Sequence, residues 1–251
     1  MEIEFKEIKN LVNQIKFDEA HERIRNLMEI DPENAPKKGR QVDLAHWLIL
    51  AADWQLINKI MPMDLNFLLS SGWLRSLYLK EPVNTNRSPI PWITYPAIDF
   101  LEQKIQKDWT VFEWGSGNST LWWSERVKYV HAVESNKEYY EKFSNDKKDN
   151  IMKDNIMIKL CEDEDSYINA IETSQFSLFD VVVIDGDSRN LCAKKAVEHV
   201  KDDGIIVFDN SDRSAYQDGI NYITDFGWMR IDFFGMIPCY TYKSCTSIFL
   251  K

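Results

Sequence analysis

The feature that most constrains the fold of this chain is a series of short β-rich runs separated by helical segments. Five such runs are TVFEW (110–114), YVHAVE (129–134), NIMIKL (155–160), FDVVVIDG (179–186) and GIIVFDN (204–210). Strands and helices in alternation indicate a parallel sheet with helices on both faces. WMRIDFFG (228–235) and CTSIFLK (245–251) are expected to complete the sheet as antiparallel strands. We therefore predict an α/β fold with a Rossmann-like, doubly wound, mostly parallel sheet of seven strands.

The N-terminal part of the chain is expected to be helical. Apolar residues recur at helical spacing over residues 5–28, Pro32 ends the second of two helices, and another apolar helix is predicted over 42–61. The first two helices resemble one tetratricopeptide unit, which cannot form a solenoid alone, so a packing or dimerisation arm is favoured. We predict a helical arm over residues 1–70, through which the chain would form a homodimer, and a second domain over residues 71–251.

The segment that precedes the first strand is expected to change character halfway. Residues 71–94 are rich in Pro, Asn and Ser, which favours an irregular loop. The stretch from Tyr95 to Ile105 has the spacing of an amphipathic helix, with Pro96 in its first turn, where proline is well tolerated. Trp92 and Tyr95 would either line a ligand site or pack in the core.

Charge and composition exclude several classes of protein. The net charge of −10 and the isoelectric point near 5.0 argue against a partner that is nucleic acid, because phosphate binding needs a basic face. No apolar run reaches the roughly 18 residues that a membrane span requires, and the first ten residues do not resemble a signal peptide, so we expect a cytoplasmic protein without a membrane span. The four cysteines and four histidines are scattered, which argues against structural zinc.

Two glycines directly follow the first predicted strand, in the stretch VFEWGSGNSTLWW (111–123). Such glycines allow the backbone to approach a ligand at the carboxyl edge of the sheet. A dinucleotide site would require a third glycine, where this chain has Thr120, and a phosphate loop would require a lysine. Glu113 precedes the first glycine by two residues, and its negative charge would suit the amino group of a methionine moiety.

Acidic residues follow the other predicted strands as well. Glu134 ends the second strand, nineteen residues (134 − 115) past Gly115, where an acid can accept both ribose hydroxyls. Glu162 or Asp163 follows the third strand, where it could meet an adenine amino group. Asp185 and Asp209 close the fourth and fifth strands, so the acids are expected to form one rim.

The region from about Trp109 to Asn210 resembles a class I S-adenosylmethionine-dependent methyltransferase. VFEWGSGNS is similar to the first motif of that superfamily, VHAVE to the second and FDVVVIDG to the fourth. The chain departs from the fullest first motif at Ser119, where that motif has a third glycine. Within the superfamily, the segments PIPWITYPAIDFL, IDGDSRNLC and GIIVFDNSDRSAY resemble a bacterial group often associated with surface-polysaccharide genes. A different Rossmann-like domain with incidental acids is the alternative.

The resemblance implies S-adenosyl-L-methionine as the cofactor and predicts the residues around it. The expected cofactor-binding residues are Glu113, Gly115, Ser116, Gly117, Ser119, Glu134, Asp163 and Asp185. Asp185, Asp209 and Asn210 also resemble the oxygen ligands of metal-dependent O-methyltransferases of the catechol type, a set that would suit Mg²⁺. The alternative is that Asp185 orients the substrate and that Asp209 and Asn210 form a turn.

Two arginines follow these acids in loops at the same rim. Arg189 and Arg213 could hold a phosphate or carboxylate of the acceptor through bidentate hydrogen bonds, or could form surface ion pairs. With Asp185 as the general base, these three residues are the expected catalytic group.

We expect an enzyme that transfers a methyl group to a hydroxyl of a small acceptor, a sugar or nucleotide sugar, in the synthesis of a surface or capsule polysaccharide. The alternatives are an N-methyltransferase of a small amine or peptide, which lacks support because no NPPY-like tetrapeptide follows the fourth strand, and a non-catalytic scaffold that binds the cofactor.

Overall fold

The computed structural model of this chain describes residues 67–146 and 154–251. The chain divides into two compact units, Met1–Ser70 and Ser71–Lys251. The helices expected within residues 5–61 lie outside the described residues, and the short helix α4 (Phe67–Ser70) is the described part of the first unit.

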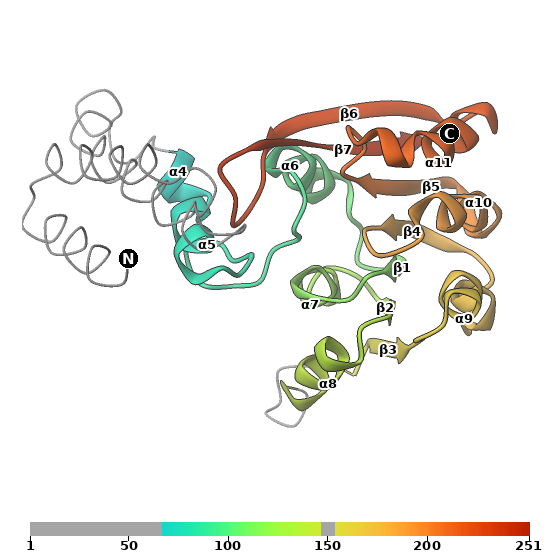
Figure 1. Cartoon of the computed structure of the whole chain (residues 1–251), viewed down its shortest axis with the longest axis horizontal. Coiled ribbons are helices and arrows are strands. Elements are labelled where there is room, and N and C mark those ends of the chain that lie inside the picture. The colour runs from blue at the N-terminus through green and yellow to red at the C-terminus, as the bar shows by residue number, and fades with distance from the viewer. Residues whose placement is uncertain (1–66, 147–153) are drawn as a thin grey trace, which may run out of the picture. The chain divides into compact units, whose positions relative to one another are not determined.

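A seven-stranded sheet forms the centre of the second unit (Figure 1). Its strands are β1 (Thr110–Trp114), β2 (Tyr129–Glu134), β3 (Ile156–Leu160), β4 (Phe179–Ile184), β5 (Val200–Asp209), β6 (Met229–Met236) and β7 (Lys243–Leu250). They lie in the order β3-β2-β1-β4-β5-β7-β6, in which β1 to β5 are parallel and β7 is antiparallel to both of its neighbours. The predicted mostly parallel sheet of seven strands is confirmed.

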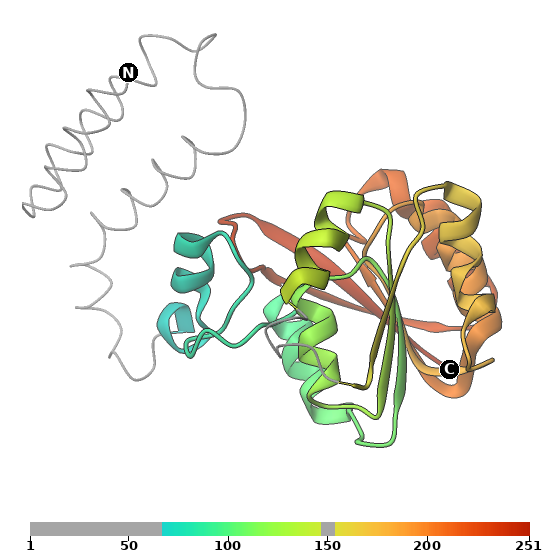
Figure 2. The same ribbon diagram turned by 90° about the horizontal axis from the view of Figure 1, so that it is seen from below.

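Helices cover both faces of the sheet. They are α5 (Trp73–Leu79), α6 (Tyr95–Lys104), α7 (Asn118–Ser124), α8 (Lys137–Asp146), α9 (Glu164–Ile168), α10 (Arg189–His199) and α11 (Gln217–Asp225), with the 3-10 helices η3 (Asn169–Thr173) and η4 (Ser214–Tyr216). Figure 2 shows α6, α7 and α8 on one face and α9, α10 and α11 on the other. Every residue of β1 and β4 is therefore buried, as expected of central strands in a three-layer fold.

The segment before β1 is partly helical where the sequence predicted a loop. Residues 73–79 form α5, because WLRSLYL contains no Pro, Gly or Asn, whereas the loop-forming residues begin only at Pro82. The helix predicted from Tyr95 to Ile105 is confirmed as α6, with proline at its first turn.

The strand order places a ligand crevice at one position on the sheet. From β1 the chain first adds β2 and β3 on one side, and then crosses over to add β4 and β5 on the other. The chain therefore leaves the neighbouring strands β1 and β4 toward opposite faces of the sheet, where α7 and α10 follow (Figure 2). In open α/β sheets the ligand binds at this switch point, outside the carboxyl ends of the strands.

Candidate functional site at the carboxyl edge of the sheet

Two glycines allow the loops that follow β1 and β4 to touch. Gly115 has a φ of 98°, and a Cβ added there would lie 3.1 Å from the backbone of Gly186. A Cβ on Gly186 would lie 1.8 Å from the Tyr167 hydroxyl oxygen and 3.0 Å from the nitrogen of Gly115. Neither position has room for a side chain. The two glycines therefore allow the backbones of these loops to lie in contact at the carboxyl edge of the sheet.

Gly117 has a different function, since its φ of 166° is extended backbone that any residue adopts. A Cβ added at Gly117 would lie 3.0 Å from the hydroxyl oxygen of Tyr139, on α8. Burial raises the pKa of Tyr139 to about 12, and the nearby carboxylates, Glu134 most of all, act in the same direction. The phenol of Tyr139 thus lies against the glycine loop, among the acids of the rim, a position that the sequence pattern did not indicate.

Glu113 is a completely buried carboxyl on β1 with an unfulfilled hydrogen-bonding capacity. Its Oε2 accepts a hydrogen bond of 2.6 Å from the Thr120 hydroxyl, which itself accepts the amide of Gly117 at 3.0 Å. Within residues 67–146 and 154–251, its Oε1 has no hydrogen-bond partner. Burial raises the pKa of Glu113 to about 7, although the hydroxyls of Ser119 and Thr120 act in the opposite direction. A buried polar atom without a partner is uncommon, and a ligand group or a water molecule at this position would satisfy it.

Glu134 connects the end of β2 to the glycine loop. Its Oε2 accepts hydrogen bonds from the amide and hydroxyl of Ser116, at 3.2 and 2.9 Å, and its Oε1 accepts the amide of Asn136 at 2.9 Å. A carboxylate has about four acceptor positions, so these three bonds leave capacity for a further donor. The structure therefore places Glu134 and Ser116 together beside the crevice, as the sequence predicted.

Asp163 has a structural function that the sequence interpretation overlooked. It is the N-cap of α9, where its carboxylate accepts the amide of Ser166 at 2.8 Å and the hydroxyl of the same residue at 2.6 Å. These bonds lower the pKa of Asp163. The pattern Asp-x-x-Ser at the start of a helix is a capping signal that the sequence already contained. Contact with an adenine remains a prediction for this residue.

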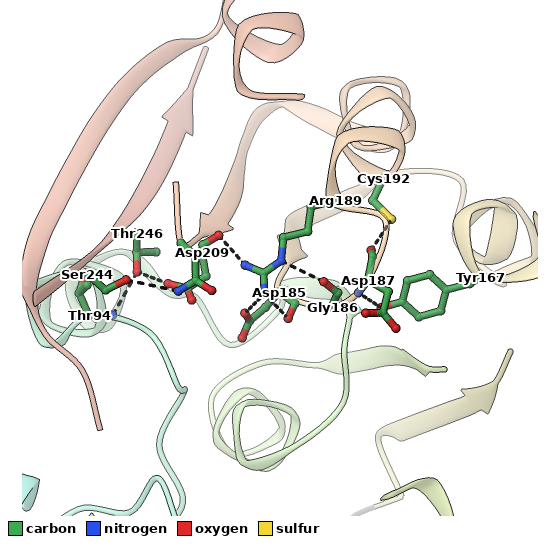
Figure 3. Close-up of polar contacts among 11 residues, drawn as sticks. Thr94, Tyr167, Asp185, Gly186, Asp187, Arg189, Cys192, Asp209, Ser244 and Thr246 are labelled. Atoms are coloured by element: carbon green, nitrogen blue, oxygen red, sulfur yellow. Dashed lines mark hydrogen bonds and ion pairs between the residues drawn. The ribbon is translucent and has the colours of Figure 1, made fainter. Parts of the chain in front are cut away.

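Arg189 joins the ends of β4 and β5 (Figure 3). Its guanidinium donates to the carbonyl oxygens of Gly186, Asp209 and Asp185 at 2.9, 2.5 and 2.9 Å, and to Oδ1 of Asp185 at 3.0 Å. The residue is buried, and its guanidinium carbon lies 5.0 Å from the ring centre of Tyr216. Four of its five N–H groups are engaged within the chain. This arrangement positions Asp185 and is a poor clamp for an acceptor, contrary to the role that the sequence suggested.

Asp185 and Asp209 form a pair of carboxyls at the ends of β4 and β5. Burial raises the pKa of Asp185 to about 6, against the lowering effect of the Arg189 guanidinium. Burial, followed by the nearby charge of Asp185, raises the pKa of Asp209 to about 8. Thr246 donates to Oδ1 of Asp209 at 2.6 Å and accepts the amide of Thr94 at 3.0 Å. Each carboxyl disfavours ionisation of the other, and the guanidinium of Arg189, which is bonded to Asp185, favours ionisation of Asp185 over that of Asp209.

Asn210 follows Asp209 in a left-handed conformation, with a φ of 54°, and its side-chain amide donates to the Ser244 hydroxyl at 3.3 Å. This is the turn chemistry expected of asparagine. The three residues predicted to bind a metal, Asp185, Asp209 and Asn210, do lie at the same edge of the sheet. However, Asp185 already accepts the guanidinium of Arg189, and Asp209 already accepts the hydroxyl of Thr246. A cation next to a carboxylate opposes the binding of a second one, so the set fits Mg²⁺ poorly.

Arg213 differs from Arg189 in being exposed. Its guanidinium carbon lies 6.0 Å from the ring centre of Tyr216, and its charge helps to lower the pKa of Asp185. Among the described residues no carboxylate forms an ion pair with it. Arg213 is therefore available to an anionic group at the rim.

Two solved structures share the fold of this chain. One is the precorrin 8W decarboxylase of Methanobacterium thermoautotrophicum, with a TM-score of 0.51, 14% identity, and coverage of 68% of this chain and 96% of that chain. The other is the precorrin-6y C5,15-methyltransferase of Geobacter metallireducens, with a TM-score of 0.50, 15% identity, and coverage of 62% and 86%. No protein family and no curated protein matches the chain. At these identities the likeness establishes the fold alone.

The described helices include none of the length and apolar character that crossing a membrane requires. Among all the described residues, no three or more His, Cys, Asp or Glu side chains are grouped so that they could hold a metal ion.

Proposed function

We propose that this chain is an S-adenosylmethionine-dependent methyltransferase that binds its cofactor across the ends of β1, β2 and β4. The observation that carries the proposal is the buried Oε1 of Glu113, which has no partner in the described chain and lies two residues before Gly115. The cationic amino group of the methionine moiety would donate to this oxygen. That contact would also hold Glu113 in its ionised form, because an adjacent positive charge lowers a carboxyl pKa.

The remaining cofactor contacts follow from the order of the strands. Glu134 has acceptor capacity for a ribose hydroxyl, and Gly115, Ser116, Gly117 and Ser119 would line the methionine end. Asp163 would lie nearest the adenine. Tyr139, whose hydroxyl lies against Gly117, would rest on the bound cofactor or move aside for it.

The proposed reaction is methylation of an acceptor hydroxyl. When bound, the cofactor would supply a methyl group activated by a positively charged sulfur, and the residues at this edge of the sheet would hold the acceptor hydroxyl toward it. Asp185 would accept the hydroxyl proton, since a base with a pKa of about 6 is ionised at neutral pH and still basic enough to assist. Arg189 positions Asp185, and Asp209 would remain protonated beside it.

We propose the metal-free form of this reaction. Oδ1 of Asp185 already accepts the guanidinium of Arg189 at 3.0 Å, and this adjacent positive charge would oppose the binding of a divalent ion. The test of both proposals is transfer from methyl-labelled S-adenosylmethionine to a panel of sugars, sugar phosphates and nucleotide sugars, with and without EDTA. Labelled product formed equally in both arms supports them. Loss of activity with EDTA, restored by Mg²⁺, would overturn the metal-free form alone.

The finer parts of the proposal rest on the sequence resemblance. They are a sugar or nucleotide-sugar acceptor, a place in the synthesis of a surface polysaccharide, a cytoplasmic location, and a packing or dimerisation role for residues 1–70. Transfer to an amine or peptide and not to a hydroxyl, in the same assay with an extended panel, would contradict the first of these. A chain that binds the cofactor yet methylates none of the panel would favour the scaffold.

A further inference from the structure

Three aromatic side chains stack in a row on the surface of the second unit, and we call Trp92, Tyr240 and Tyr242 the aromatic row. The ring centres of Trp92 and Tyr240 are 5.7 Å apart with planes inclined by 22°, and those of Tyr240 and Tyr242 are 5.0 Å apart at 32°. The three rings are 38%, 37% and 48% exposed. Exposed aromatic residues scattered singly are ordinary, but here Trp92 stacks on Tyr240 and Tyr242 packs against it at a tilt, so the three rings form one apolar patch.

The aromatic row is held in place by contacts with buried groups. Trp73, almost fully buried, donates from its indole nitrogen to the carbonyl of Tyr240 at 2.9 Å. Cys239, just before it, has a φ of 68°, a left-handed conformation that few non-glycine residues adopt. The indole of Trp73 therefore anchors the backbone of the turn between β6 and β7 at Tyr240.

The aromatic row lies at the same edge of the sheet as the proposed catalytic carboxyls. Ser244, two residues after Tyr242, accepts the side-chain amide of Asn210. Thr94, two residues after Trp92, donates its amide to Thr246, the residue that donates to Asp209. The row is thus joined at both ends to the loop that follows β5.

A cation lies on the loop that contacts the chain just after the last ring of the row. The amide of Arg213 donates to the carbonyl of Asn210 at 3.0 Å, which places Arg213 on the same loop. The side-chain amide of the same Asn210 donates to the hydroxyl of Ser244, so Arg213 and Tyr242 both lie within three residues of this one contact. An exposed guanidinium beside an exposed ring can hold an anionic group while the ring supports a flat apolar face.

We propose that the aromatic row and Arg213 bind an acceptor in which a six-membered ring with an apolar face is joined to a phosphate. The ring stacks on Tyr242 and the phosphate pairs with Arg213, so that a hydroxyl of the acceptor faces Asp185. The inference rests on the proposed methyltransferase function and names the acceptor class for that site. Pyranose rings of sugar phosphates and bases of nucleotides share this chemistry.

The test is calorimetry on the full chain saturated with S-adenosylhomocysteine. The probes are three hexose 1-phosphates (glucose, galactose and mannose), UMP, UDP-glucose, inorganic phosphate and methyl glucoside. We expect at least one probe that combines ring and phosphate to bind about tenfold more tightly than inorganic phosphate or methyl glucoside. Hexose phosphates that bind in preference to UMP indicate a sugar ring on the row, and the reverse preference indicates a base.

Substitutions then test the row itself. Tyr242→Ala and Arg213→Gln should each weaken binding of that probe by about tenfold or more. Phe226→Ala is the matched control, since Phe226 is an exposed aromatic residue at the C-cap of α11, before β6, at the opposite edge of the sheet, and it should bind the probe as wild type does. Affinity for S-adenosylhomocysteine should be unchanged in all three variants, which shows that they are folded.

Two outcomes overturn the inference and leave the proposed function standing. One is tight binding of S-adenosylhomocysteine with no binding of any ring phosphate at millimolar concentration. The other is a ring phosphate that binds equally to wild type, Tyr242→Ala and Arg213→Gln. A wild-type chain that fails to bind S-adenosylhomocysteine contradicts the proposed function itself.

Discussion

The Thr120 hydroxyl donates a hydrogen bond of 2.6 Å to Oε2 of Glu113, while Oε1 of the same buried carboxyl has no partner in the described chain. Thr120 stands where a dinucleotide fingerprint would have its third glycine. A threonine at this position contributes a contact that glycine could not, because its hydroxyl holds the Glu113 carboxyl in one orientation. One oxygen is used to fix the side chain, and the other is left for a ligand.

Glu113→Gln should weaken cofactor binding and stabilise the cofactor-free protein. The change removes the charge that would pair with the amino group, which should cost about 2 kcal/mol of binding free energy. The folded-state pKa of Glu113 is raised from 4.5 to about 7, so its contribution to stability is fully present below pH 4.5 and lost as pH rises through 7. The variant should therefore unfold less readily than wild type at pH 8, by up to about 3 kcal/mol, and equally at pH 4.5.

The measurement is urea unfolding of both proteins at pH 8 and pH 4.5, with calorimetric titration of S-adenosylhomocysteine at pH 8. A merely structural role for Glu113 predicts loss of stability in the variant at pH 8. That result, together with unchanged affinity, would remove Glu113 from the cofactor site.

Glu134→Ala should weaken binding of S-adenosylhomocysteine by about 2 to 3 kcal/mol, the range for loss of a charged hydrogen-bond partner. Part of this loss would come from the loop, because Glu134 also accepts the amide and hydroxyl of Ser116. Ser116→Ala is the control that separates the two, since it removes a loop contact and retains the acid. Equal losses in both variants would mean that Glu134 acts only by holding the loop.

Asp185→Asn and Asp209→Asn should differ sharply in activity. With a pKa of about 8, Asp209 is mostly protonated at pH 7, so a neutral amide should replace it with a loss in kcat of less than about tenfold. Asp185 is ionised there, and loss of a general base should lower kcat by about 100-fold or more. A metal held by both residues predicts that the two variants are crippled alike, so steady-state kinetics at pH 7 distinguish the mechanisms.

Arg189→Gln should shift the pH profile of kcat/KM. The guanidinium lowers the pKa of Asp185, so its removal should move the acidic limb of the profile, expected near pH 6 in wild type, to higher pH. If Arg189 instead clamps the acceptor, the limb should remain in place and KM for the acceptor should rise. Arg213→Gln provides the comparison, since the proposed acceptor contact predicts for it the larger increase in KM.

The seven-stranded sheet, and the edge of it at which the glycine loop lies, could be predicted from the sequence. The ends of β1, β2, β4 and β5 were predictable because these apolar runs stop at, or directly before, an acid or a glycine. The glycine loop after β1 indicated the edge at which a ligand is expected. The capping role of Asp163 was also readable in the sequence, since an acid three residues before Ser166 is a capping pattern as well as an acid after a strand.

The partners of the site residues could not be predicted in the same way. Arg189 is twenty residues from Asp209 in sequence, and only the side-by-side packing of β4 and β5 brings its guanidinium to that carbonyl. The aromatic row depends on contacts between Trp92 and the β6–β7 turn, 148 residues later (240 − 92). Periodicity reports which side chains are buried along one element, and it contains no information on which distant element they meet.

Calorimetric titration of the wild-type chain with S-adenosylhomocysteine, and separately with NAD, tests whether the site after β1 binds S-adenosylmethionine or a dinucleotide. The buried acid of Glu113 would repel a pyrophosphate and attract the amino group of the methionine moiety. We predict binding of S-adenosylhomocysteine with a dissociation constant on the order of micromolar, about −8 kcal/mol, and no heat with NAD. Binding of NAD with no response to S-adenosylhomocysteine would contradict the assignment of a methyltransferase.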